Sequence, residues 1–388
     1  MKTFDAYRLF FPLGILLGLG GVAIWPLFYF GILTGYWGIS HAFLQSNGFL
    51  FCFIAGFLLT AVPRFTQTNP PAILAQTILA SVVIAGAIAL ELQSYSTAQL
   101  LFAVAYVILL VVILSRFLKR KSAQLPDTFS LIGIALITGT AGAIVNALGM
   151  WGIAAEWALA GKRSLTEGMT LLLVLGVGGF LGPRLLGFER LMVVGMSGLK
   201  SRNRRWLHAR NLYFIGGIIV LLTLILEYRL GWMWASFVRA GAASIIFLVT
   251  IKPWQLPAVR TTLAWCVWTS VWLTIIALWL IAFFPIYQVD FLHILFIGGF
   301  SLLIMAVGMR VTLSHGGHGL AREKKNWPLR VGLTAGLIAM LARAGAPFSP
   351  KAYAMHLELA AILWMIGIGI WGWRLVRLIF QRERPSLP

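Results

Sequence analysis

Long uncharged apolar stretches recur along the whole chain and are separated by charges, prolines and polar clusters. Most contain about 20 residues, which is the length an α-helix needs to cross a hydrocarbon core of about 30 Å. Only Glu227, Arg229 and Gly231 favour a turn between the seventh stretch and the eighth. The pattern predicts twelve helices, at residues 9–33, 43–63, 72–92, 97–118, 128–152, 168–187, 212–230, 232–251, 263–286, 290–312, 329–349 and 353–379.

Composition supports an all-α polytopic membrane protein, with residues 1–388 forming a single transmembrane domain. Hydrophobic residues make up 60% of the chain and charged residues only 11%, which excludes a water-soluble core. The first apolar stretch is too long for the core of a signal peptide, so we expect it to remain as the first helix. Cys52 and Cys266 both fall inside apolar stretches, and their positions suggest neither a disulfide nor a metal site.

The formal net charge of +20 is better explained by orientation in a membrane than by binding to nucleic acid. With the N-terminus in the cytoplasm, 25 of the 31 basic residues lie on the inner side, five lie outside and Arg239 lies within a span. This bias predicts twelve spans with both the N- and C-termini cytoplasmic, and lipid as the main partner. The five residues assigned to the outside are Lys162, Arg163, Arg229, Arg343 and Lys351.

This topology divides the six histidines into two groups. His41, His293 and His356 lie at the outer side, whereas His208, His315 and His318 are cytoplasmic. Neutral imidazoles are ligands for haem iron, copper and zinc, so the outer group is a candidate cofactor or metal site. The alternative is that each is simply a polar residue tolerated at the membrane interface.

Two arginines are further candidates. Arg239 is the deepest charge, and it could be the partner of a carboxylate, a haem propionate or another anion, or half of a buried structural ion pair. Arg310 is either an interfacial cation or a partner for a propionate or other anion. The glycines and Pro183 of the sixth stretch predict a broken or a closely packed helix. No nucleophile arrangement, Walker sequence or pair of catalytic carboxylates is present in the sequence, so no catalytic residue is predicted.

The sequence SHAFLQSNGFLFCFIAGFLLTAVPRFT, residues 40–66, resembles the signature of the NnrS family of polytopic bacterial membrane proteins. Members usually begin this element with a His-x-His-Glu pattern. Here His41 matches the first histidine, while Phe43 and Leu44 replace the second histidine and the glutamate. DFLHILFIGGFSLLIMAVGMRVTLSHGGH resembles another family element, in which His293, Arg310 and His315 match. The GVGGFLGPRLLG run resembles a third family element, in which Phe180 stands where an arginine is expected. Arg184 could partly take the place of that arginine.

The resemblance extends over nearly the whole chain, including the opening YRLFFPLG and the closing LELAAILWMIGIGIWGWR. It implies a protein of the bacterial inner membrane that is associated with haem and copper and takes part in the response to nitric oxide, in denitrification or nitrosative stress. His41, His293 and His356 become candidate haem ligands, and His41 and His293 candidate metal ligands. The substitutions at Phe43 and Leu44 weaken the inference of copper. No reaction follows from the resemblance.

Two other functions fit the same sequence. A secondary transporter of a small solute would have a midplane site formed by a broken sixth span and Arg239. A quinol-linked cytochrome b would need two histidines on facing helices for each haem, and the inner-side histidines do not lie within spans. We therefore rank the cytochrome b last.

Overall fold

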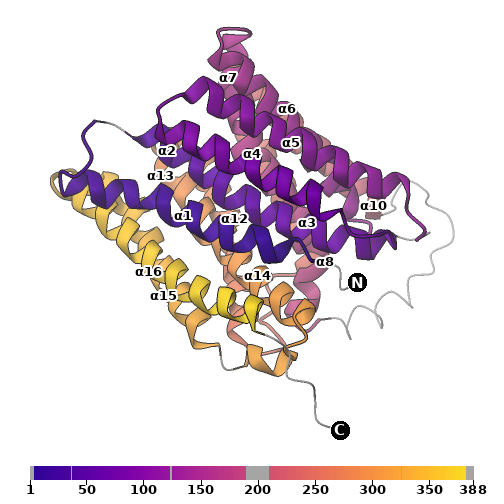
Figure 1. The fold of residues 1–388 in the computed structure, drawn as a ribbon. Coiled ribbons are helices and arrows are strands. Elements are labelled where there is room, and N and C mark those ends of the chain that lie inside the picture. Colours follow the sequence, from indigo (N-terminus) through magenta and orange to yellow (C-terminus); the bar gives the residue numbers. More distant parts are fainter. Residues whose placement is uncertain (1–3, 36, 123–124, 189–208, 325, 382–388) are drawn as a thin grey trace. The chain divides into compact units, whose positions relative to one another are not determined.

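The computed structural model describes residues 4–35, 37–122, 125–188, 209–324 and 326–381, and within these ranges it contains helices and no strand. Figure 1 shows the helices of the chain, coloured along the sequence. The chain forms two compact units. Unit 1 consists of Met1–Ala123 together with Ser301–Pro388, and unit 2 is Gln124–Phe300.

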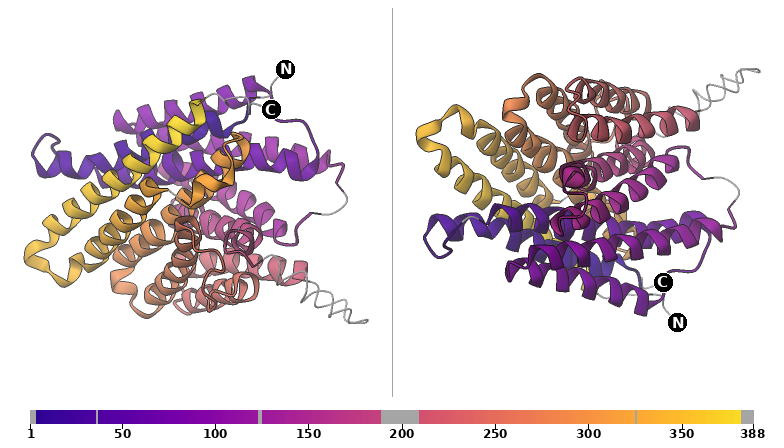
Figure 2. Two further views of the ribbon diagram at one scale, coloured as in Figure 1. Left: turned by 90° about the horizontal axis from the view of Figure 1, so that it is seen from below. Right: turned by 90° about the horizontal axis from the view of Figure 1, so that it is seen from above.

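Unit 1 is built from helix pairs. α1 (Tyr7–Tyr29) packs against a composite span made of α2 (Gly38–Phe43), η1 (Leu44–Leu50) and α3 (Phe51–Thr66). α16 (Tyr353–Phe380) lies beside both α1 and α15 (Trp327–Gly345), and the yellow and orange ribbons of α15 and α16 run together in Figure 2. The remaining elements are α4 (Ile73–Glu91), α5 (Tyr95–Leu118), α14 (Leu302–His315), η7 (Leu320–Glu323), η8 (Ala346–Phe348) and η9 (Pro350–Ala352).

Unit 2 follows a similar plan. α6 (Phe129–Met150) packs against a composite span made of η2 (Ala155–Trp157), α7 (Ala158–Arg163), η3 (Ser164–Gly168) and α8 (Met169–Leu185). α10 (Ala209–Tyr228) pairs with α11 (Ala235–Ile251). The last span of the unit follows α12 (Thr262–Phe283) and consists of η5 (Pro285–Tyr287), α13 (Gln288–His293) and η6 (Ile294–Ser301), with α14 continuing it.

The polytopic all-α architecture predicted from hydropathy is confirmed. Eleven helical stretches of the described residues are long and apolar enough to cross a membrane, and Ala235–Ile251 is a shorter apolar helix. Each of these twelve helical stretches corresponds to one of the twelve predicted spans. α10 and α11 are separate helices, and the turn between them contains Gly231 at a φ of +70°, a conformation that glycine adopts without steric cost.

The sixth span starts earlier than predicted, and its glycine-rich half follows one of the two predicted alternatives. It begins at Ala155 rather than near residue 168, because Lys162 and Arg163 lie within the helix and not in an outer loop. Its glycine-rich half is one continuous helix, α8, so close packing rather than a break explains the glycines. A Cβ at Gly182 would come within 3.0 Å of the Ile251 side chain.

Three spans share a further feature that composition does not reveal. The second, sixth and tenth each contain a six-residue α-helix, then a π-helical segment, then a longer α-helix that carries an arginine toward its end. The π-helical segments are η1, η3 and η6. This form therefore recurs at every fourth span along the chain. π-Helical segments occur frequently at functional sites.

Candidate functional site

His41 lies on α2, three residues before the π-helical segment η1. Its Nδ1 atom is 2.8 Å from the carbonyl oxygen of Gly21 on α1, and its ring meets the edge of Trp25 at a centroid distance of 5.4 Å. Gln45, one turn later, donates from Nε2 to the carbonyl oxygen of Gly18 at 2.8 Å. The orientation of this imidazole is therefore set by α1.

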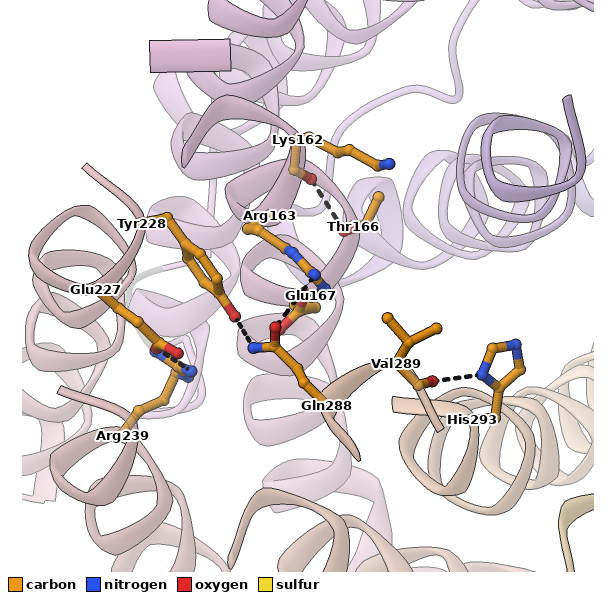
Figure 3. Close-up of polar contacts among 10 residues, drawn as sticks. All are labelled: Lys162, Arg163, Thr166, Glu167, Glu227, Tyr228, Arg239, Gln288, Val289 and His293. Carbon is orange, nitrogen blue, oxygen red and sulfur yellow. Dashed lines mark hydrogen bonds and ion pairs between the residues drawn. The ribbon is translucent and has the colours of Figure 1, made fainter. Parts of the chain in front are cut away.

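His293 ends α13, directly before η6. Its Nδ1 atom is 2.7 Å from the carbonyl oxygen of Val289 in the same helix, as Figure 3 shows. Both histidines thus face a carbonyl oxygen, an acceptor, with Nδ1. This favours the neutral tautomer that is protonated at Nδ1 and carries its lone pair on Nε2.

The third outer histidine is placed differently. His356 lies in the first turn of α16, half-buried, and its Nδ1 atom is buried with no hydrogen-bond partner among the described residues. His41 and His356 belong to unit 1, whereas His293 belongs to unit 2. Within the described part of the chain, no three His, Cys, Asp or Glu side chains gather as a metal-binding group. His208 lies outside the described residues.

Arg310 and His315 on α14 have local partners. The Nη1 atom of Arg310 is 2.7 Å from Oε1 of Glu323 on η7. His315 accepts a hydrogen bond at Nδ1 from the guanidinium of Arg64, which also pairs with Asp5 at 3.3 Å. The structure therefore gives Arg310 a carboxylate partner within its own unit.

Arg239 on α11 is 3% exposed and forms an ion pair with Glu227 at the end of α10, with Nη2 and Oε2 2.6 Å apart. This arrangement is the buried ion pair considered as the structural alternative. However, the Nη1 atom of Arg239 is buried and has no hydrogen-bond partner among the described residues. The guanidinium therefore retains a capacity to bind an acceptor.

Sequence reasoning missed the residues that surround Arg239. Arg163 forms an ion pair with Glu167 one turn later, and Glu167 is 4% exposed, although both were assigned to an outer loop. Their spacing of four residues, which places two side chains on one helix face, was the signal that could have identified them. Arg163 also contacts Gln288, which in turn bonds to Tyr228.

Comparison with known proteins identifies the chain. The family model for "NnrS protein" matches residues 4–383, which includes both units. A search of the curated proteins gives no match. The match accounts for nearly the whole length of a polytopic helical membrane protein, and the chain therefore belongs to the NnrS family.

Proposed function

We propose that this protein associates with haem, for which His41 of unit 1 and His293 of unit 2 are each a candidate ligand within their own unit, and that it binds or relieves nitric oxide in the bacterial inner membrane. Membership of the NnrS family supports a role in the nitric oxide response at the level of the family. The observation that carries the finer proposal is the shared environment of the two imidazoles, in which Nδ1 faces a backbone carbonyl oxygen at 2.7–2.8 Å.

This environment fits a haem ligand. Metal-binding histidines usually donate their second ring N–H to a carbonyl or carboxylate, which fixes the ring and raises the basicity of the ligating nitrogen. Both histidines also stand next to π-helical segments, where the backbone departs from regular α-helix. His356 remains a third candidate ligand, and Arg239 a candidate partner for a propionate through Nη1.

When bound, haem would supply an iron centre suited to a small uncharged diatomic gas. The protein's own contribution is to hold the imidazoles neutral and oriented. Because the surrounding spans are apolar, nitric oxide can reach such a centre through lipid, without a polar channel.

Copper does not fit equally well. Phe43 and Leu44 stand where the family pattern has a histidine and a glutamate, and both are buried apolar side chains, 3% and 4% exposed. Neither supplies a donor atom for a metal. The proposal therefore includes haem and leaves copper out.

The test is a dithionite-reduced minus oxidised absorbance spectrum of the purified full chain, with iron counted on the same sample. We expect Soret and α bands that are lost in His41→Ala or His293→Ala. His318→Gln is the control, because its amide can still donate to the Leu378 carbonyl oxygen that His318 Nε2 contacts at 2.7 Å. A folded, colourless, iron-free wild-type protein, expressed with sufficient haem, would contradict the proposal.

Secondary transport of a small solute is the second candidate function. The continuous α8 removes the broken sixth span from that hypothesis, whereas the buried Arg239 continues to favour it. Substrate-dependent uptake into vesicles that contain pigment-free protein would support transport.

A further inference from the structure

A group of charged and polar side chains joins four spans of unit 2, shown in Figure 3. Glu167 and Arg239 are buried in it, and the other members are half-buried. The group lies where the sixth and tenth spans begin, α10 ends and α11 begins. We call it the polar cluster, and its members are Arg163, Glu167, Glu227, Tyr228, Arg239 and Gln288.

Tyr228 connects the two arginines. Gln288 donates from Nε2 to the Tyr228 hydroxyl at 2.5 Å and accepts from Arg163 Nη2 at 3.4 Å. The guanidinium carbons of Arg163 and Arg239 lie 5.2 Å and 6.0 Å from the centre of the Tyr228 ring. Two guanidinium groups therefore approach one aromatic ring, each with its own glutamate.

The charges of the cluster cancel, but its hydrogen-bonding groups do not. Each guanidinium has five N–H donors and no acceptor. Arg163 Nε and Arg239 Nη1 are both buried with no partner among the described residues. A ligand that satisfies these donors must offer acceptors, and oxyanions match the planar fork of a guanidinium.

The position of the cluster in the fold provides a second, independent observation. Of the three junctions between a short α-helix and a π-helical segment, the first follows His41 by three residues and the third directly follows His293. The middle junction ends in Arg163 instead. A guanidinium does not coordinate a metal, so the junction in the sixth span offers hydrogen-bond donors for an anion where the other two junctions offer imidazoles.

We propose that the polar cluster binds a small, singly charged oxyanion of the carboxylate or nitrite class through Arg239 and Arg163, and that Glu227 takes up a proton when the anion binds. The proton is required by charge. The charges of the six members cancel, and the nearby Lys162 is half-buried. An anion therefore adds one negative charge to a largely buried site, which is unfavourable. Protonation of Glu227 restores neutrality and releases Arg239 for the anion.

Glu227 is the carboxylate best placed for this role. Its 2.6 Å contact with Arg239 is an ion pair that lacks hydrogen-bond alignment. By contrast, Glu167 both pairs and hydrogen-bonds with Arg163. The charged and titratable groups near Glu227 are Arg239 from α11, Arg163 and Glu167 from the sixth span, and Tyr228 from α10 itself. Gln288 from α13 is neutral.

The experiment is calorimetric titration of the purified full chain with sodium acetate and sodium nitrite, with sodium chloride for comparison. The protein is the His41→Ala/His293→Ala double variant, so that binding of an anion to iron is not mistaken for binding to the cluster. We expect acetate or nitrite to bind more tightly than chloride, with an affinity that rises as the pH falls, by at most about tenfold for each pH unit, because one proton is taken up with the anion.

Variants separate the two parts of the proposal. Glu227→Gln, which resembles the protonated acid, should bind with an affinity that no longer depends on pH. Arg239→Lys keeps the charge but loses the fork, and should weaken binding by at least about tenfold. Arg184→Gln is the control, since Arg184 is an exposed arginine at the end of the sixth span opposite Arg163 and stacks on Phe180.

The oxyanion site would be overturned if neither acetate nor nitrite binds to the folded double variant, or to the folded double variant that also carries Glu227→Gln. Equal binding of chloride would do the same, since it would show charge attraction without recognition of an oxyanion. Binding that does not change with pH would overturn the role of Glu227. None of these outcomes affects the reduced spectrum of the wild-type protein, so the proposal that His41 and His293 are haem ligands stands or fails separately.

Discussion

At the scale of single residues, the two candidate haem ligands depend on different parts of the chain. The carbonyl that orients His41 belongs to Gly21, twenty residues earlier on a neighbouring helix. The carbonyl that orients His293 belongs to Val289, one turn earlier in the same helix. His41 is therefore sensitive to helix packing, while the geometry of His293 is local and persists wherever α13 folds.

The buried pair of Arg163 and Glu167 leads to a first prediction, on stability. Glu167→Gln should lower the free energy of unfolding by about 3–5 kcal/mol, because it leaves the Arg163 charge buried without its carboxylate. The double variant Arg163→Gln/Glu167→Gln should lose clearly less, since neither charge remains. Denaturation of the detergent-solubilised protein would measure both. Lys162→Gln, at the half-buried neighbouring position, serves as the control. A single variant as stable as wild type would show that the pair is not required.

At the scale of elements, hydropathy was sufficient to predict where each span lies but not its internal form. An apolar run of about 20 residues indicates a membrane helix because charges are costly in lipid. By the same rule, the charged Lys162 and Arg163 were assigned to a loop. The rule considers residues singly, and so it misses the ion pair by which Glu167 neutralises Arg163 within the helix. The π-helical segments were not predicted, because a wider turn requires no distinctive composition.

The contact between α1 and η1 gives a second prediction. A Cβ at Gly21 would come within 2.8 Å of the Leu44 Cβ and 2.7 Å of Gln45 Nε2, whereas a Cβ at Gly20 meets nothing within 4 Å. Gly21→Ala should therefore destabilise the protein by about 1–3 kcal/mol through overpacking. Gly20→Ala should be neutral or slightly stabilising, because alanine favours the helix.

Thermal unfolding of both alanine variants would measure this difference. Because Gly21 also supplies the carbonyl that orients His41, Gly21→Ala should weaken the reduced haem bands as well, and Gly20→Ala should leave them unchanged. Equal stability of the two variants would show that η1 can move away from α1 without loss.

At the scale of the whole molecule, three spans of the same local form carry the candidate sites at corresponding ends. His41, the polar cluster and His293 lie near the start of the second, sixth and tenth spans. Spans of even number run in the same direction through a membrane, so these starts share one side. The sequence indicated this side through its basic residues, but the candidate site of unit 2 required the structure, because Arg163 and Glu167 resembled loop residues.

The last prediction tests which side that is. Native Cys52 and Cys266 are both fully buried, so a cysteine introduced at the surface can be labelled selectively. Asn69 and Ser94 are exposed at opposite ends of α4, which makes Asn69→Cys and Ser94→Cys a matched pair. The predicted orientation, which places 25 of the 31 basic residues on the cytoplasmic side, implies that a membrane-impermeant maleimide should label Ser94→Cys in intact spheroplasts. It should label Asn69→Cys only after lysis.

The labelling pattern shows which side of the membrane the candidate sites face, because the order of the spans along the chain places each site on the same side as one of these two loops. The second span starts at the same side as Ser94, since α4 runs in the opposite direction between the two loops. Labelling of Ser94→Cys alone would therefore place His41, His293 and the polar cluster toward the outer face, where an oxyanion arrives from outside the cytoplasm. Labelling of Asn69→Cys in intact spheroplasts would reverse the orientation, and the same sites would then face solutes of the cytoplasm.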